Sequence, residues 1–124
     1  MSVASGYRKQ ADLMKALAHP TRLQIMDILS NEESCGCHMT AIVRKRQPNV
    51  SQHLMVLRDA ELVRDRKDGN VIYYSLVDER ITEILAKARE LLLTLDPEAV
   101  FPEVPLSPIA GCSCPKCSGE GRCS

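Results

Sequence analysis

The sequence predicts a mainly α-helical domain with a β-hairpin, and three patterns along the chain support this prediction. Apolar residues recur at helical spacing over much of residues 7–95. Asp68-Gly69, between two β-prone runs, is a strong signal for a tight hairpin turn. A helix, a short turn and a second helix come before this hairpin, which is the order of a winged helix-turn-helix. The expected fold is therefore mainly α with a β-hairpin wing (α+β).

Pro20 separates the first two predicted helices. A helix over residues 7–18 would present one apolar face, made of Tyr7, Ala11, Met14 and Ala18. Because the residue before a proline avoids the helical conformation, this helix should end near His19, which is expected to cap or pack at the helix end. Thr21 can begin the second helix, and the polar residues 31–34, rich in capping side chains, should follow its end.

Two shorter helices are expected next. The first covers about residues 37–45, and its inward side chains are Met39, Ile42 and Val43. Pro48 suits the first turn of the second, over about residues 48–58, because the N–H that proline lacks is not needed there. On this second helix Val50, Leu54 and Leu57 share one face, whereas Ser51, Gln52 and Met55 point elsewhere.

The last predicted elements are the hairpin and the longest helix. The strands are expected at residues 62–66 and 71–76, and the helix at 78–95. The apolar stripe of this helix consists of Ile81, Ile84, Leu85, Ala88, Leu91, Leu92 and Leu95. Such a stripe is wide for a terminal helix, and a small domain gains stability from dimerisation. We therefore expect the helix to pack on a second subunit as well, which predicts a homodimer.

The composition changes after residue 95. Sixteen of the last 29 residues are Pro, Gly, Ser or Cys, which are turn-forming, helix-breaking or thiol residues. We therefore expect a folded domain over residues 1–95 and a C-terminal tail over residues 96–124, whose order depends on what its thiols bind.

Several classes of protein are not expected. No apolar run approaches the roughly 18 residues that span a bilayer, and the N-terminus has no apolar signal stretch, so we expect a cytoplasmic protein without membrane contact. The chain shows no phosphate-binding loop, no paired catalytic carboxylates and no Cys/His pair with an orienting acid, so an enzyme is not expected. The net charge of zero argues against a wholly basic protein but leaves local patches open.

The cysteines form two groups. Cys35 and Cys37 make one pair, and the others crowd residues 112–124: Cys112, Cys114, Cys117 and Cys123. In a reducing cytosol such thiols are typical of metal binding or redox sensing. A disulfide framework is the alternative, because an even number of cysteines in a short chain also suits it.

A basic patch accompanies the predicted helix-turn-helix. Residues 44–67 carry seven basic and three acidic side chains, and phosphate binding requires such a patch because counterion release supplies much of the affinity. A solvated surface is the alternative. In a winged helix, the helix at 48–58 enters the major groove of double-stranded DNA, where amides and hydroxyls can read base edges. The predicted DNA-binding residues are Gln47, Asn49, Val50, Ser51, Gln52, His53, Arg66 and Lys67.

Four segments together carry a resemblance to a known family. They are Leu17-Ala18-His19-Pro20-Thr21-Arg22-Leu23, Asn49-Val50-Ser51-Gln52-His53-Leu54, Leu57-Arg58-Asp59-Ala60-Glu61-Leu62-Val63 and Arg66-Lys67-Asp68-Gly69-Asn70. Over about residues 8–95 the chain resembles the ArsR/SmtB family of metal-sensing repressors, and is most similar to its arsenic-responsive branch. The resemblance implies a dimeric winged helix that represses its operator when metal-free and leaves it when metal binds. It also implies that the helix at 78–95 joins the first helix in the dimer interface.

The resemblance further implies where an inducer would bind. Cys35-Gly36-Cys37 is similar to the Cys-x-Cys segment at the start of the third helix in the arsenic- and cadmium-sensing branches. The arsenic pattern has a third Cys three residues past the second, and here that position is Thr40. Because residues 1–34 contain no Cys, the tail is the remaining source of a third thiolate. The predicted metal ligands are Cys35, Cys37, Cys112, Cys114, Cys117 and Cys123. The alternatives for the tail are a metal cluster of its own or no sensing role.

An all-sulfur site selects soft ions. Trivalent arsenic takes three thiolates in a pyramid, so arsenite is the expected inducer, with antimonite, cadmium and lead as alternatives and no organic cofactor. A zinc site of the family's last-helix type is not expected, because residues 78–95 contain no His. His38 could be a ligand, but a surface position at a helix start is the simpler expectation, and His53 is expected on phosphate or in the core. The rival function is a thiol redox sensor on the same fold.

Overall fold

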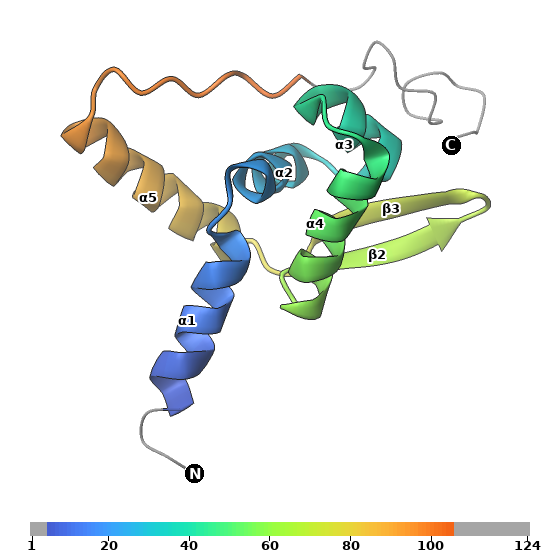
Figure 1. Ribbon diagram of the computed structural model, residues 1–124, viewed down its shortest axis with the longest axis horizontal. Coiled ribbons are helices and arrows are strands. Elements are labelled where there is room, and N and C mark those ends of the chain that lie inside the picture. Colours follow the sequence, from blue (N-terminus) through green and yellow to red (C-terminus); the bar gives the residue numbers. More distant parts are fainter. Residues whose placement is uncertain (1–4, 106–124) are drawn as a thin grey trace.

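The computed structural model describes residues 5–105 of the chain. Helices dominate, and one small antiparallel sheet stands to one side of them (Figure 1). In chain order the elements are α1 (Ser5–Leu17), α2 (Pro20–Asn31), β1 (Ser34–Cys35), α3 (Gly36–Val43), α4 (Gln47–Asp59), β2 (Val63–Asp68), β3 (Val71–Leu76) and α5 (Arg80–Leu95). The predicted fold class, a winged helix-turn-helix, is confirmed.

The break between α1 and α2 lies where the sequence predicts it. The backbone N–H of Thr21 donates a hydrogen bond to Nδ1 of His19 at 3.1 Å, so His19 caps α2 as expected. Pro20 occupies the first turn of α2, one residue earlier than the predicted start, because a missing N–H costs nothing at that position.

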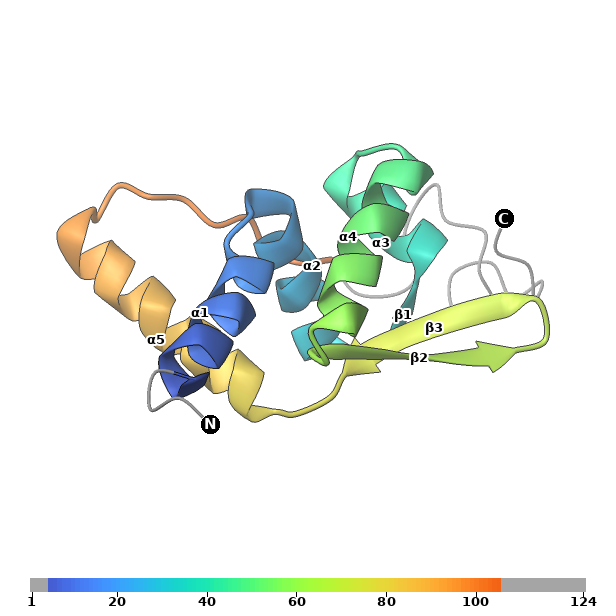
Figure 2. The same ribbon diagram turned by 60° about the horizontal axis from the view of Figure 1, so that its bottom comes forward.

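The sheet has the order β1-β3-β2 and contains one strand that the sequence did not predict. β2 and β3 form the expected hairpin, with Gly69 at a positive φ of 63° in the turn. The polar residues 31–34 were expected to follow the end of the second helix, with no strand predicted there, but Ser34 pairs with Tyr74 and Cys35 with Tyr73. A strand of two residues has no periodicity of its own, so only the partner strand shows that it exists. Figure 2 shows the hairpin extending away from the helices.

The main core lies between α2, α3 and α4. Its fully buried side chains include Ile25, Met26, Met39, Val50 and Leu57. A satellite cluster lies between the start of α3 and β3, and consists of Cys35, Val71 and Tyr73 with Cys37 and Ala41 packed against them. The hairpin is therefore held to the helices partly through the two cysteines. Among the described residues, no helix is both long and apolar enough to span a membrane.

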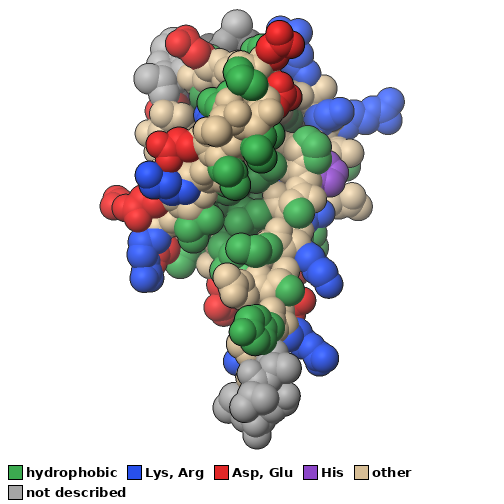
Figure 3. Space-filling view, turned by 90° about the vertical axis from the view of Figure 1, so that its left-hand side faces the viewer, with side chains coloured by type: hydrophobic (Ala, Val, Ile, Leu, Met, Phe, Trp, Pro, Cys, Tyr) green, Lys and Arg blue, Asp and Glu red, His purple; other side chains and the backbone are tan. Residues whose placement is uncertain are grey.

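The apolar stripe predicted on the last helix divides into two faces. Ile81 is buried and Leu85 packs against the main core, whereas Ile84, Leu91 and Leu95 are exposed. On α1, the predicted apolar residues Tyr7 and Met14 are also exposed, Tyr7 by 80%. Figure 3, which views the side of the molecule that carries α1 and α5, shows hydrophobic side chains gathered there. We call Tyr7, Met14, Ile84, Leu91 and Leu95 the α1/α5 face.

Candidate nucleic-acid interface and thiol site

Helix α4 separates its buried and exposed side chains sharply. Val50, Leu54 and Leu57 are buried in the main core, and the predicted DNA-binding residues Gln47, Asn49, Ser51 and Gln52 are exposed. Val50 is a correction: it was predicted among the DNA-binding residues, but its side chain is completely buried and cannot reach DNA. Its spacing from Leu54 and Leu57 explains this, because residues four and seven apart share a helix face.

His53 lies half-buried at the boundary between the two faces of α4. Its Nδ1 accepts a hydrogen bond from Nε of Arg22 at 3.1 Å, and its ring lies 4.4 Å from the ring of His19, centroid to centroid. Arg22 also donates to the backbone carbonyl of Ala16 at 3.0 Å. Burial, followed by the nearby His19 and Arg22, lowers the pKa of His53. The neutral ring therefore links α4 to the beginning of α2, and DNA contact by His53 stays a prediction.

Basic side chains flank the exposed face of α4. Arg44, Lys45 and Arg46 are exposed in the turn before the helix, and Arg44 ends α3 with a left-handed φ of 57°. Near the other end of α4, Arg58 lies 3.3 Å from a carboxylate oxygen of Asp65 on β2. The turn residues were not among the predicted DNA-binding residues, although the charge of residues 44–67 already pointed to them. Cations at the start of α4 suit a helix whose polar face meets phosphates.

Arg66 is exposed on the hairpin and is ion-paired within the protein, and its contact with DNA stays a prediction. Its guanidinium forms two hydrogen bonds to Glu33, at 2.6 and 2.9 Å, and lies 4.8 Å from the ring centroid of Tyr73. The hydrogen bond to Glu33 is the main cause that raises the pKa of Arg66. Lys67, the next residue, is exposed. Glu33 had no signal in the sequence, because its closeness to Arg66 depends on the unpredicted strand β1.

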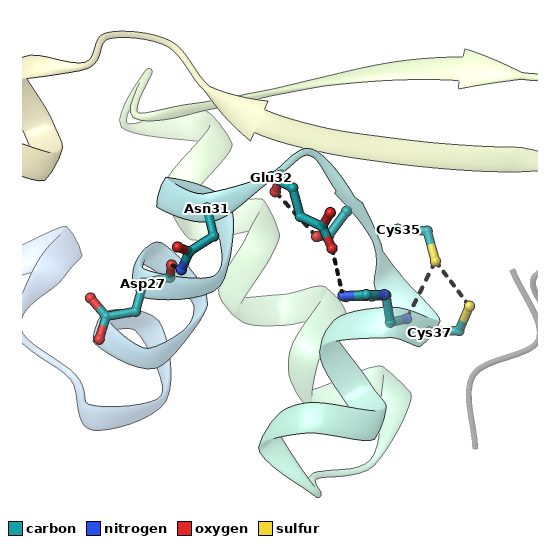
Figure 4. A network of polar contacts seen from close by, with 7 residues as sticks. Asp27, Asn31, Glu32, Cys35 and Cys37 are labelled. Carbon is teal, nitrogen blue, oxygen red and sulfur yellow. Dashed lines mark hydrogen bonds and ion pairs between the residues drawn. The ribbon is translucent and has the colours of Figure 1, made fainter. Parts of the chain in front are cut away.

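Cys35 and Cys37 meet where β1 passes into α3. Cys35 is 1% exposed, caps α3 by accepting the backbone N–H of His38 at 3.3 Å, and pairs with Tyr73 across the sheet. Its Sγ lies 3.0 Å from Sγ of the half-buried Cys37 (Figure 4). The predicted pair is thus brought together, with one sulfur in the sheet and one in the first turn of the helix.

The sulfur pair fits part of a site for a soft ion. Two thiolates that bind one ion at about 2.3 Å hold their sulfurs roughly 3.3–3.8 Å apart, depending on the bond angle. The observed 3.0 Å is a few tenths of an ångström shorter, so a small movement would accommodate the ion. Within residues 5–105, no group of three or more Cys, His, Asp or Glu could hold a metal. The other predicted ligands, Cys112, Cys114, Cys117 and Cys123, lie outside the described residues.

Two residues near the cysteines, His38 and Thr40, are engaged in contacts within the fold. His38, expected at the surface, is 1% exposed, with Nε2 lying 3.5 Å from Oε1 of Glu32. The expectation is wrong because β1, which directly precedes α3, pairs with β3 and so places the first turn of α3 against the sheet. Thr40, at the position of the missing third cysteine, donates its hydroxyl to the carbonyl of Gly36 at 2.8 Å. Cys35 is a free thiol, whereas Cys37 is disulfide-bonded, so the two sulfurs at 3.0 Å are not bonded to each other.

The chain matches known proteins over this part of its length. Residues 19–65 match the family model described as bacterial regulatory protein, arsR family. An uncharacterized HTH-type transcriptional regulator of Methanocaldococcus jannaschii is 40% identical over 86 residues, covering 68% of this chain and 97% of that protein. An arsenical resistance operon repressor of Staphylococcus xylosus is 40% identical over 73 residues, covering 59% of this chain and 70% of that protein.

Two further matches are a relative named for cadmium resistance and a solved structure with a similar fold. A cadmium resistance regulator CadC homolog of Staphylococcus aureus is 37% identical over 79 residues, covering 63% of this chain and 65% of that protein. The crystal structure of Rv0081 from Mycobacterium tuberculosis superposes with a TM-score of 0.67 at 37% identity, covering 72% of this chain and 90% of that one.

Proposed function

Because the chain belongs to the ArsR family of bacterial transcriptional regulators, we propose that it is a cytoplasmic, homodimeric repressor whose inducer is arsenite. In this proposal the dimer binds double-stranded operator DNA, and leaves it when arsenite binds cysteine thiolates. The observation that carries the proposal is the pair of sulfurs, 3.0 Å apart, of which Cys35 lies on a strand that pairs with the wing and Cys37 lies in the first turn of α3.

The exposed face of α4 supports the DNA-binding role. Ser51 and Gln52 offer a hydroxyl and an amide to base edges, and three exposed cations precede the helix for phosphates. The buried side chains on the opposite face fix α4 against the core, so its polar groups keep one orientation. We propose Gln47, Asn49, Ser51 and Gln52 as the residues that face the major groove, with Lys67 and Arg66 at the wing.

The α1/α5 face supports the homodimer. Large apolar side chains such as Leu95, exposed by 75%, are unfavourable in water when they cluster on one side of a small domain. A second copy would cover them through a two-fold interface, in which each subunit contributes the same surface. Two copies of α4 would then face two half-sites of the operator.

The tail supplies the missing ligand in this proposal. Trivalent arsenic prefers three thiolates, and the described residues provide Cys35 and Cys37 only. We propose that one of Cys112, Cys114, Cys117 and Cys123 provides the third. Antimonite would bind likewise. Cadmium and lead are the alternative inducers, and the CadC homolog among the relatives supports keeping cadmium in the test.

The sheet offers a direct route from the thiols to the DNA-binding surface. Cys35 pairs with Tyr73 on β3, and Tyr73 in turn pairs with Arg66 on β2. An ion that draws Cys35 and Cys37 toward a tail thiol would pull on the short strand β1 and thereby move the wing. Release requires that the ion bind the DNA-free arrangement more tightly than the DNA-bound one, and a wing coupled to the ligands provides such a difference.

The experiment measures DNA release with a duplex that the protein itself selects from a random library. Reduced protein is titrated in parallel with arsenite, antimonite, cadmium, lead and zinc in a non-thiol reductant, and fluorescence anisotropy reports the bound DNA. We expect release by arsenite in wild type and none in Cys35→Ser or Cys37→Ser, because a hydroxyl replaces a soft thiolate poorly. Thr40→Ser, which keeps both thiols, is the matched control and should respond normally. Normal arsenite release in either cysteine variant would reject the proposal.

The disulfide at Cys37 favours a second candidate, a thiol redox sensor. In that case two protein thiols form a disulfide and give up two electrons and two protons to an oxidant such as glutathione disulfide, which is reduced to two glutathione thiols. DNA is then released without arsenite. Oxidation of arsenite-free protein, followed by the same anisotropy measurement, separates the two functions. Release on oxidation alone would favour the redox sensor.

A further inference from the structure

Helix α1 enters the hydrophobic core through its C-terminal end. Of its 13 residues, the buried ones are Ala16 and Leu17, and both belong to the main core. Figure 1 shows the N-terminal part of α1 projecting away from α2, α3 and α4. A helix of this length measures about 20 Å, so a tilt of about 10° at its attached end moves the other end by about 3 Å. The contacts at the attached end therefore decide where α1 points.

Arg22, in the first turn of α2, contacts α1 at this attached end. Its Nη1 donates to the carbonyl oxygen of Ala16 at 3.0 Å and to that of Lys15 at 3.4 Å. Carbonyl groups in the last turn of a helix have no acceptor role within the helix, and a basic side chain can satisfy them and interact favourably with the helix dipole. The guanidinium of Arg22 thus caps α1 from the neighbouring helix.

The same guanidinium also holds α4. Its Nε donates to Nδ1 of His53 at 3.1 Å. The ring of His19, which caps α2, lies against the ring of His53 with the centroids 4.4 Å apart. Because Nε and Nη1 belong to one rigid, planar group, Arg22 fixes the last turn of α1 relative to His53 on α4.

The shape of this side chain matters more here than its charge. Within residues 5–105, Arg22 forms no ion pair with an acidic side chain. Its hydrogen bonds go to neutral acceptors, which are two carbonyl oxygens and an imidazole nitrogen. A lysine would keep the charge, but its single nitrogen lacks the fork that reaches acceptors on two helices at once.

The cross-link joins the two surfaces that the proposed function uses. Tyr7 and Met14 of α1 belong to the α1/α5 face, proposed to contact the second subunit, and α4 is proposed to read DNA. We infer that Arg22 is a positioning residue that sets the distance between the two copies of α4 in the dimer, and with it the spacing of the half-sites that the dimer selects. This inference rests on the proposed function. Because base pairs are about 3.4 Å apart along DNA, a displacement of about 3 Å corresponds to about one base pair of spacing.

Arg22→Gln tests the inference on a set of duplexes. One is the duplex that wild type selects from a random library, and the others carry the same half-sites with a base pair added or removed between them. In anisotropy titrations of reduced full-length protein, we expect wild type to bind the altered duplexes about tenfold more weakly or worse. In Arg22→Gln this discrimination should fall to about threefold or less. Arg8→Gln, the same loss of charge at an exposed position of α1, is the matched control and should discriminate like wild type.

Arg22→Lys separates position from charge. We expect it to lose discrimination as Arg22→Gln does, because the cross-link needs the guanidinium fork. On a random duplex, the salt dependence of binding should be the same in wild type and both variants, since a residue that contacts no phosphate releases no counterions. Wild-type discrimination in Arg22→Lys, or a salt dependence reduced in Arg22→Gln and restored in Arg22→Lys, would indicate a phosphate contact and overturn the inference.

His53→Ala removes the other end of the cross-link. It should lower the discrimination between spacings likewise, and Arg22→Gln should cause little further loss in this background, because residues of one hydrogen-bond network do not act additively. Independent losses would mean that Arg22 does not act through α4 and would overturn the inference. Circular dichroism and sedimentation should show wild-type helicity and a dimer in each variant.

The failures of the two proposals are distinguishable. If wild type binds no duplex or sediments as a monomer, the proposed function fails. If wild type is a DNA-binding dimer that binds every spacing equally well, or if Arg22→Gln keeps the full discrimination, only the role of Arg22 is wrong.

Discussion

Helix α4 and the cysteine segment use burial in opposite ways. α4 buries an apolar face and exposes the polar side chains proposed to meet DNA. The cysteine segment buries the sulfur of Cys35 and the ring of His38 inside the fold, both in residues that are 1% exposed. A residue on the exposed face can change with little effect on the rest of the molecule. A ligand bound at the buried sulfur must instead move the strand and helix around it, which is what a sensor requires.

The two regions also differ in how complete they are. The groups proposed to read DNA lie on α4 and the wing, all within the described residues. The sensor has two sulfurs there and needs a third from the tail in our proposal. The predictions below test this contrast, from the largest expected effect to the smallest.

Truncation after Leu95 should separate the two regions most clearly. The shortened chain keeps α4, the wing and the α1/α5 face, so we expect a dimer that binds DNA. Its arsenite response should be lost or shifted at least tenfold, because two thiolates with a hydroxide hold arsenite less tightly than three thiolates. Anisotropy with arsenite titration measures the response, and sedimentation measures the dimer. An unchanged arsenite midpoint would show that the sensor is complete without the tail.

Removing polar groups from the exposed face of α4 should weaken DNA binding and leave the arsenite response unchanged. We expect Ser51→Ala or Gln52→Ala to weaken binding to the selected duplex by about 1–3 kcal/mol, the value of a good base-edge contact, and to leave non-specific binding nearly unchanged. Gln10→Ala, the same change at an exposed position of α1, is the matched control. Equal losses on specific and random duplexes would exclude Ser51 and Gln52 from base contact.

The Glu33–Arg66 ion pair connects the wing to the segment that carries the cysteines, and variants at both positions test its effect on DNA binding. Arg66→Ala should weaken binding to all duplexes by a similar, severalfold factor and reduce the salt dependence, because a phosphate contact carries no sequence information. Glu33→Gln should act in the opposite direction, because it frees the guanidinium and removes a negative charge beside the wing. Affinity measured at several salt concentrations checks both variants. A decrease in both would mean that the pair supports the wing's conformation rather than competing with DNA.

The smallest predicted effect concerns pH and the link between His53 and Arg22. Burial and the neighbouring His19 and Arg22 lower the pKa of His53 below its ordinary value of 6.5. The folded chain therefore binds this proton less well than the unfolded chain does, and stability should fall as the pH drops below about 6.5. In His53→Gln, urea unfolding midpoints between pH 7.5 and 5 should show a shallower decline than in wild type. Identical slopes would remove His53 as a source of the pH dependence.

Most of the fold could be predicted from the sequence, because its elements have clear local signals. The proline at residue 20, the Asp68-Gly69 turn and the helical spacing of apolar residues are each visible without tertiary contacts. The predicted bounds differ by only a few residues from those observed. Strand β1 was missed because two residues cannot show alternation, and its pairing depends on β3, almost forty residues later.

The candidate site could be predicted in its residues better than in its contacts. The closeness of Cys35 and Cys37 followed from their spacing. The burial of His38 and the pairing of Glu33 with Arg66 both depend on β1, and so could not be predicted without it. Val50 shows the converse error: it lies within the motif of the reading helix, but its helical phase places it in the core.

The charges of strand β2 have a second consequence, which concerns solubility. Within residues 5–105, β2 is an edge strand, since the sheet order β1-β3-β2 leaves one of its sides without a partner strand there. An open strand edge can pair with the same edge of another molecule and so begin aggregation, unless charged side chains prevent close approach. Arg64, Asp65, Arg66, Lys67 and Asp68 give this edge an unbroken run of charges of both signs. Variants that replace several of them with apolar residues to abolish DNA binding would therefore also unprotect the edge, so loss of binding in such variants must be distinguished from self-association of the hairpins.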